Sequence, residues 1–290
     1  RPRPRSAAPA PRRGRPAARG SRRARRPAVA RPRGSRLRLD RQAERLAWLA
    51  DTLPRLEGSG IVYCLTVRDV ENVAAWLTSQ GIEVEAYFGS LDNNARIEAE
   101  RKLQTNEIKA LVATTALGMG YDKPDLSFVV HFQSPGSPVA YYQQVGRAGR
   151  ALETSRGILL RGQEDEQIQD WFIEQAFAEE HLVNDIVNAF DSFDGPVSLM
   201  AIRTLELVVK QLDVDGVLER VAGTSYQRTL APWTYPASRV EAVTIERRLE
   251  QQAMVDYFHT TGCRMRFIAN LLDDPAADDC GICDNCTGDT

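Results

Sequence analysis

The stretch QQVGRAGR, residues 143–150, is the most informative part of this 290-residue chain. An apolar run at 128–132 precedes it and another at 157–160 follows it, which predicts a strand on each side. Pro138 favours the start of a helix that leads into the stretch. Two arginines three residues apart on one helix face, between glycines that admit close approach, can clamp a phosphate group. The alternative is a solvated helix end with incidental arginines.

Short apolar runs alternate with helical patterns on both sides of this stretch. The strand-like runs lie at 61–65, 83–87 and 110–113, and the helical patterns lie at 46–53, 70–79, 93–103 and 164–177. This order predicts an α/β domain over residues 41–180, built on a parallel sheet flanked by helices. Ligands on such sheets bind at the loops beyond the carboxyl ends of the strands.

The first 36 residues differ in composition from the rest of the chain. They hold 14 Arg, 7 Pro, 8 Ala and no acidic residue, whereas residues 37–290 hold 23 basic and 39 acidic residues. Such a segment lacks the apolar side chains that could offset the entropy of folding, so we expect residues 1–40 to be disordered. Three interpretations are open: a basic tail that holds nucleic acid, a Pro/Arg-rich linker, or a mis-read stretch of GC-rich coding DNA.

No export or membrane signal stands out in the sequence. Hydrophobic residues make up 43% of the chain, enough for a buried core, but no apolar run reaches the roughly 18 residues of a membrane span. The N-terminal residues lack the apolar centre of a signal peptide. We therefore expect a cytoplasmic protein without a membrane partner, associated with the nucleoid if it is bacterial.

Residues 181–236 carry a different pattern of elements. Helical periodicity at 182–190 and 199–212 is followed by two strand-like runs, 217–221 and 226–230, around a turn that contains Gly223. Helices followed by a β-hairpin indicate a winged-helix-like α+β module. The alternative is a generic small α+β module that only packs on the first domain.

Four of the five cysteines gather near the C-terminus, as Cys263, Cys280, Cys283 and Cys286. Four thiolates at this spacing can form a closed tetrahedral zinc site with no open ligand position, so we expect one structural zinc in a small helical module at 237–290. A chance cluster, disulfides or an iron–sulfur cluster are the alternatives. The fifth cysteine, Cys64, lies in an apolar run and is interpreted as a buried thiol.

The string Gln-x-x-Gly-Arg-x-Gly-Arg resembles motif VI of superfamily 2 helicases, and Tyr141-Tyr142-Gln143 ahead of it resembles the RecQ version. Residues 61–64, 86–91, 112–124 and 129–132 are similar to other RecQ segments in the same order, and 260–264 resembles the RecQ zinc module. The resemblance implies the C-terminal half of an ATP-dependent 3′–5′ DNA helicase that acts in DNA repair or recombination. Its expected parts are a second RecA-like motor domain, the winged-helix-like module and the zinc module.

The resemblance also implies roles for single residues. Arg147 and Arg150 are expected to face the ATP phosphates, with Arg150 as the arginine finger and Gln143 near the nucleotide. The positions expected to couple the nucleotide to DNA are Gly118, Gly120 and Asp122. Thr114 is expected to contact a phosphate group of the DNA strand.

Other nucleic-acid contacts are less firmly tied to the family pattern. Thr66 is followed by Val67, so that Arg68 comes one residue later than in the family, and Phe88 stands where the family has His. Because the body of the chain is acidic, binding is expected to use local arginines: Arg228 on the hairpin, and Arg264 and Arg266 beside the cysteines. His131 is interpreted as a packing residue.

The 290 residues contain no phosphate loop, because none of the lysines follows a glycine. ATP and Mg²⁺ are therefore expected only together with a missing N-terminal motor domain, and the chain alone is expected to be inactive. Single-stranded or partly duplex DNA is the expected partner. The rival interpretations are a non-catalytic nucleic-acid-binding module and a truncated, inactive product.

Overall fold

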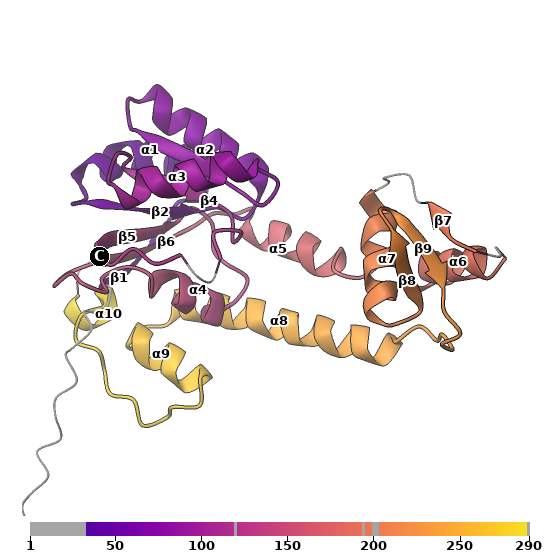
Figure 1. Cartoon of the computed structure of the whole chain (residues 1–290). Coiled ribbons are helices and arrows are strands. Elements are labelled where there is room, and N and C mark those ends of the chain that lie inside the picture. Colours follow the sequence, from indigo (N-terminus) through magenta and orange to yellow (C-terminus); the bar gives the residue numbers. More distant parts are fainter. Residues whose placement is uncertain (1–32, 119–120, 193–194, 199–202, 289–290) are drawn as a thin grey trace, which may run out of the picture.

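The computed structural model describes residues 33–118, 121–192, 195–198 and 203–288. A large α/β body and a smaller α+β unit lie at opposite ends of the long helix α8 (Ala237–His259) (Figure 1). Two shorter helices, α9 (Arg264–Leu271) and α10 (Asp284–Thr287), follow α8 beside the large body. Within the described residues, no helix is both long and apolar enough to cross a membrane.

The body is built on six parallel strands in the order β1-β6-β5-β2-β4-β3, which confirms the predicted parallel sheet. The strands are β1 (Arg33–Arg38), β2 (Ser59–Tyr63), β3 (Val84–Tyr87), β4 (Ala110–Ala113), β5 (Leu126–His131) and β6 (Arg156–Arg161). Along the central strands, alternate side chains enter two separate cores: Ile61 and Val129 lie on one face, Val62 and Val130 on the other. Burial on both faces explains why these runs are continuously apolar in sequence.

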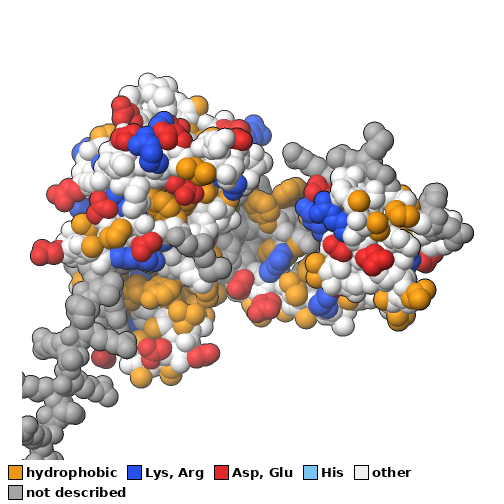
Figure 2. All heavy atoms as spheres, in the orientation of Figure 1, with side chains coloured by type: hydrophobic (Ala, Val, Ile, Leu, Met, Phe, Trp, Pro, Cys, Tyr) orange, Lys and Arg blue, Asp and Glu red, His pale blue; other side chains and the backbone are white. Residues whose placement is uncertain are grey.

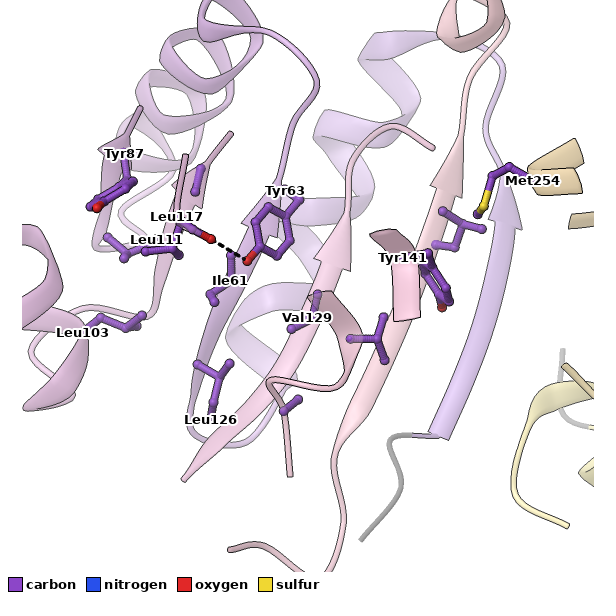
Figure 3. Close-up of a cluster of buried hydrophobic side chains, with 14 of the residues drawn as sticks. Ile61, Tyr63, Tyr87, Leu103, Leu111, Leu117, Leu126, Val129, Tyr141 and Met254 are labelled. Atoms are coloured by element: carbon purple, nitrogen blue, oxygen red, sulfur yellow. Dashed lines mark hydrogen bonds between the residues drawn. The ribbon is translucent and has the colours of Figure 1, made fainter. Parts of the chain in front are cut away.

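Different helices cover the two faces of the sheet. Helices α1 (Gln42–Thr52) and α2 (Val67–Ser79) pack on the Val62 face through residues such as Leu49 and Val73. The Ile61 face, shown in Figure 3, is covered by α3 (Asn93–Gln104), α4 (Pro138–Val145) and the C-terminal helices α8 and α9. Met254 and Ile268, from α8 and α9, are therefore part of the core of the α/β body.

Strand β1 corrects the expectation that residues 1–40 are disordered. It pairs in parallel with β6 over its whole length, from Arg33 opposite Arg156 to Arg38 opposite Arg161. Leu37 packs against the core, and the guanidinium group of Arg36 stacks over the Phe258 ring at 5.2 Å. An arginine-rich strand is stable here because its stems lie along apolar surface and its backbone completes the sheet. Leu39, just after β1, also packs against the core, and residues 1–32 lie outside the described residues.

The smaller unit contains α6 (Glu180–Asp191), β7 (Val197–Ser198), α7 (Arg203–Val214), β8 (Leu218–Ala222) and β9 (Ser225–Arg228). The predicted hairpin is confirmed: β8 and β9 are antiparallel, with Gly223 in the turn at φ +54°. β7 adds a third antiparallel strand beside β9. A separate core forms between the helices and this sheet, from residues such as Val187, Phe190 and Leu212. Helix α5 (Asp165–Glu174) lies between the two units and packs on α8.

Candidate active site and metal centre

The two predicted phosphate-binding arginines lie in a turn, not on a helix. Helix α4 ends at Val145, and residues 146–150, here called the arginine turn, follow it. Within the turn, the N–H of Arg147 donates to the carbonyl of Gln144 at 3.2 Å, and that of Ala148 to Val145 at 3.0 Å. Gly149 then takes φ +81°, a left-handed conformation that glycine adopts without steric cost and that redirects the chain within the turn. The expectation of two arginines on one helix face was therefore wrong.

Local sequence explains how α4 delivers this turn. The Ser137 hydroxyl caps the helix by accepting the N–H of Ala140 at 3.1 Å, and Pro138 occupies the first turn. At the other end, Val145 packs directly over Gly157 of β6, where an added Cβ would lie 2.6 Å from the valine side chain. Gly157 thus lets α4 approach the sheet closely.

The arginine turn is attached to the loop between β4 and β5. The guanidinium of Arg150 forms an ion pair with Asp122 at 2.9 Å, and Arg147 donates to the carbonyl of Tyr121 at 3.2 Å. The N–H of Gly149 donates to the carbonyl of Leu126 at 2.8 Å. The structure therefore brings together Asp122, Arg147 and Arg150, which are separated by up to 28 residues in sequence.

The residues predicted to lie near the nucleotide differ in their exposure to solvent. Arg150 and Asp122 have side chains that are 47% and 58% exposed, so their ion pair is open to competing anions. Gln143 is exposed on α4, and Gly118 is half-buried. Gly120 lies outside the described residues. A cavity of about 580 Å³ borders the loop at Gly118 and Asp122 and extends to α3.

The sequence predicted a site at the carboxyl ends of the strands, but only part of the site lies there. Thr66 and Thr114 do follow the carboxyl ends of the neighbouring strands β2 and β4. The arginine turn, in contrast, bonds to Leu126, the first residue of β5. The reason is that α4 runs back along the sheet from the end of β5 toward the start of β6.

Three residues near the carboxyl edge of the sheet are expected to contact DNA, and two of them already form hydrogen bonds within the protein. The Thr66 hydroxyl caps α2 by accepting the N–H of Asp69 at 3.0 Å, and it donates to the Asp69 carboxylate at 2.7 Å. Thr114 is buried, and its hydroxyl accepts the N–H of Ala116 at 3.3 Å. Arg68 is exposed in the first turn of α2. Arg68 is the one charged residue of these three, and its side chain is accessible to solvent.

Two predicted nucleic-acid contacts are instead structural. Arg264 is 1% exposed and pairs with Asp284, so it cannot reach DNA as the sequence analysis expected. The guanidinium of Arg228 pairs with Asp191 at 2.8 Å and donates to two backbone carbonyls, with its side chain 17% exposed. Arg266 is exposed and pairs with Asp279 at 3.0 Å. On the face drawn in Figure 2, basic and acidic side chains are interspersed, in agreement with the acidic composition of residues 37–290.

His131 has the packing role that the sequence indicated. It is 1% exposed, and its Nε2 donates to Oε1 of Gln144 at 2.6 Å. Burial lowers the pKa of His131 to about 4, against a smaller opposing effect of the bond to Gln144. A neutral ring therefore joins β5 to α4. Cys64 is buried as expected, and burial raises the pKa of its thiol.

The four C-terminal cysteines converge on one point. Their sulfur atoms all lie within 4.8 Å of one another. Zinc–sulfur bonds of about 2.3 Å in a tetrahedron need sulfur–sulfur separations of roughly 3.8 Å, which this cluster can meet. Cys263 caps α9, and its sulfur accepts the N–H groups of Arg266 at 3.5 Å and Cys280 at 3.1 Å. Although burial opposes it, these donors lower the pKa of the Cys263 thiol to about 7, which favours the thiolate that zinc binds.

Asp284, which the sequence analysis missed, completes this module. It follows Cys283 directly, and its carboxylate receives two guanidinium nitrogens of Arg264. Arg264 also donates to the carbonyl of Tyr257 at 2.8 Å. A charged residue between two metal ligands was the available signal, but its partner was not evident from spacing alone.

Comparison with known families agrees with both sites. The helicase conserved C-terminal domain matches residues 44–152, and the RecQ zinc-binding domain matches residues 237–287. The chain is 33% identical over 245 residues to the ATP-dependent DNA helicase RecQ of Synechocystis sp., covering 81% of the chain and 50% of that relative. It is 28% identical to RecQ of Bacillus subtilis, covering 79% of the chain and 28% of the relative. The chain thus spans half or less of the length of these relatives.

Solved structures with a related chain include DEAD-box proteins. A solved structure of the Escherichia coli DEAD-box protein SrmB bound to the regulator of ribonuclease activity RraA is 27% identical with a TM-score of 0.44, covering 51% of this chain and 87% of the solved chain. A DEAD-box protein from Methanococcus jannaschii is 26% identical with a TM-score of 0.42, covering 51% of this chain and 40% of the solved chain. The four-cysteine cluster, together with the RecQ zinc-binding match over it, identifies one structural zinc. With the helicase and zinc-binding domains in this order, and RecQ relatives along most of its length, the chain belongs to the RecQ helicase family and corresponds to its C-terminal half.

Proposed function

We propose that this chain is the second motor domain and the zinc module of an ATP-dependent 3′–5′ DNA helicase, and that Arg147 and Arg150 act on the nucleotide phosphates. The observation that carries the proposal is the arginine turn, where two guanidinium groups are held beside a loop that contains Asp122. A module that only binds nucleic acid has no need for such a pair. The RecQ relatives are named ATP-dependent DNA helicases, which supports this reading.

The proposed chemistry is charge stabilisation during phosphoryl transfer. Hydrolysis also needs a phosphate loop and carboxylates that hold Mg²⁺, and the 290 residues contain no phosphate loop. ATP and Mg²⁺ would therefore bind between this domain and a first motor domain. Arg150 would exchange Asp122 for the phosphoryl group, and its loss would cost about 10³–10⁵ in rate, as for arginine fingers in general.

The DNA strand is proposed to lie along the carboxyl edge of the sheet. Thr66 and Thr114 follow adjacent strands there, and Arg68 adds an exposed positive charge. Because contacts to phosphates release counterions, binding should weaken steeply with salt. The loop that joins Thr114 to Asp122 connects this edge to the arginine turn, and is the proposed route between nucleotide and DNA.

The domain division is part of the same proposal. Residues 41–180 extended by β1 would form the motor domain, residues 181–236 a winged-helix-like module, and residues 237–290 the zinc module. The order of α6, α7 and the β8–β9 hairpin supports the winged-helix assignment. A role in DNA repair or recombination, in the cytoplasm and at the nucleoid of a bacterium, follows from the proposed DNA helicase activity.

The test joins the first motor domain of a RecQ relative to this chain at about residue 32, because a junction at residue 40 would remove β1 from the sheet. The fusion should hydrolyse ATP when single-stranded DNA is added, and the unfused chain should not. Arg150→Ala in the fusion should abolish hydrolysis but preserve ATP binding, since the finger acts mainly in the transition state. Arg55→Ala, which removes an exposed arginine that pairs with Asp51 just after α1, is the matched control. ATP turnover by the unfused chain, free of contaminating helicase, would overturn the proposal.

A further inference from the structure

A continuous series of ring contacts runs from the sheet through α4 to the zinc module. The ring of His131 on β5 stacks on Tyr63 of β2 at 5.4 Å and contacts Tyr141 of α4 at 4.9 Å. Tyr141 contacts Tyr257 of α8 at 5.1 Å, and Tyr257 contacts Phe267 of α9 at 5.8 Å. Figure 3 shows Tyr63 and Tyr141 within this core. These rings connect the sheet, helix α4 and the helices α8 and α9, which are distant from one another in sequence.

Two adjacent rings of the series, Tyr257 and Tyr141, are each linked to one of the two sites. At the zinc end, the carbonyl of Tyr257 accepts a hydrogen bond from Arg264, whose other nitrogens bind Asp284 beside the ligand Cys283. On the side of the arginines, Tyr141 lies on α4, about one turn before the arginine turn. Tyr257 therefore touches the helix that precedes the arginine turn, and its carbonyl also accepts a hydrogen bond from the arginine that pairs with Asp284, beside the ligand Cys283.

Helix α4 depends on these contacts for its position. It has eight residues, which is too short for a helix to be stable without tertiary packing. On its sheet side, Gln144 bonds to His131 and Val145 packs over Gly157. On its other side, α8 and α9 cover Tyr141, which is 3% exposed. Removing the outer contact would leave α4 held on one side only.

We propose that Tyr257 is a positioning residue for Arg147 and Arg150, and that the zinc module sets the geometry of the arginine turn through the contact between Tyr257 and Tyr141. The inference rests on the proposed function of the arginine turn and deepens it, since it makes the zinc module a support of catalysis as well as of folding. Displacement of a catalytic group by about 1 Å can cost roughly 10²-fold in rate. A modest tilt of α4 is therefore sufficient for a measurable effect.

Phe258 provides a matched control for Tyr257. It is the next residue on α8 and is 5% exposed, compared with 2% for Tyr257. Its ring lies under the guanidinium groups of Arg36 and Arg161, on β1 and β6, at 5.2 Å from each. Leucine at either position removes a ring but keeps apolar volume, so Tyr257→Leu and Phe258→Leu should perturb the α8 packing to a similar extent.

The first measurement is the ATPase activity of the fusion described above, with zinc content verified in every variant. Tyr257→Leu should lower kcat about 10-fold or more with KM for ATP changed less than about 3-fold, because the arginines act in the transition state. Tyr257→Phe, which retains the ring, should restore most of kcat, and Phe258→Leu should retain it. Equal losses of kcat in Tyr257→Leu and Phe258→Leu would overturn the inference.

The second measurement uses the chain itself and needs no ATP turnover. Hydrogen exchange should be followed at the amides of Ala148 and Gly149, which donate to Val145 and Leu126. In zinc-loaded Tyr257→Leu these amides should exchange at least about 10-fold faster than in Phe258→Leu, with the β2 and β4 amides unchanged. Unchanged exchange in the arginine turn would refute the inference even if the fusion is active. Faster exchange together with an inactive parent fusion would refute the proposed function alone.

Discussion

Two arginine–aspartate pairs in this chain have the same chemistry and opposite surroundings. Arg264 and Asp284, in the zinc module, have side chains that are 2% and 9% exposed, and Arg264 also bonds to the carbonyl of Tyr257. Arg150 and Asp122, beside the arginine turn, are 47% and 58% exposed and joined by one contact of 2.9 Å. Breaking the buried pair leaves a charged group that neither water nor a partner stabilises, whereas the exposed pair can separate at little cost in free energy because water solvates both groups. Solvent access therefore makes the first pair structural and leaves the second free to exchange partners.

The two regions also differ in completeness. The four sulfur atoms of the zinc site all come from this chain and lie close enough together to form a closed tetrahedron around a zinc ion. Under the proposed function, the arginine turn would supply only one side of a phosphoryl-transfer site. The comparison predicts that substitutions at the zinc ligands and at the Arg264–Asp284 pair act mainly on folding, and those in the arginine turn mainly on catalysis.

The largest effect on folding is expected from removal of a zinc ligand. Cys283→Ser should abolish zinc binding and unfold residues 237–290, because structural zinc contributes on the order of 10 kcal/mol of apparent binding free energy. Elemental analysis should find one zinc per parent chain and none in the variant, and limited proteolysis should cleave the variant within that region. Cys64→Ser, at the buried thiol outside the cluster, should retain the metal. Iron in the parent protein, or a well-folded metal-free sample, would contradict the zinc assignment.

The next largest effect is expected from breaking the buried ion pair. Arg264→Leu should lower the free energy of unfolding by about 3–5 kcal/mol, because it leaves the carboxylate of Asp284 buried and unpaired. Denaturant unfolding of the zinc-loaded protein measures the change. Adding Asp284→Asn should recover part of the loss, because the unpaired charge is then removed. A double variant that is less stable by the sum of both single losses would show that the pair is not coupled.

A smaller effect is expected from acidification, through His131. Its pKa is about 4 in the fold, below its ordinary value of 6.5, so the unfolded chain binds the proton first as pH falls. The associated stability is fully present above pH 6.5 and is lost progressively toward pH 4, by up to about 3 kcal/mol. His131→Gln should therefore show a smaller loss of unfolding free energy between pH 7 and pH 5 than the parent. Identical pH dependence in both proteins would exclude His131 as the source.

The smallest effect on stability is expected at the exposed pair. Arg150→Ala and Asp122→Ala should each change the free energy of unfolding by less than about 1 kcal/mol, although Arg150→Ala should abolish hydrolysis in the fusion. Thermal or denaturant unfolding of the unfused chain measures the change in the free energy of unfolding. A loss comparable to that of Arg264→Leu would remove the distinction between the two pairs.

Periodicity and spacing were sufficient for the parallel sheet, the hairpin around Gly223 and the four-cysteine cluster. These features depend on local patterns: continuous apolar runs mark strands buried on both faces, and close cysteine spacing restricts the ligands to one site. The string at 143–150 singled out Arg147 and Arg150, but the helix face predicted for them was wrong, because they lie in a turn after α4. The nucleotide and DNA roles assigned to single residues remain predictions.

Only the tertiary structure decided which charged residues are buried and which are exposed. In sequence, Arg264, Arg228 and Arg150 are equivalent cations, but the carboxylates that they meet lie 20, 37 and 28 residues away. The strand at Arg33–Arg38 has no apolar pattern of its own and is stabilised by pairing with β6. The contact between Tyr141 and Tyr257 joins residues that no local pattern relates. Sequence thus determined the elements and the reactive residue types, whereas burial and partner choice required the folded chain, because they depend on contacts between distant segments.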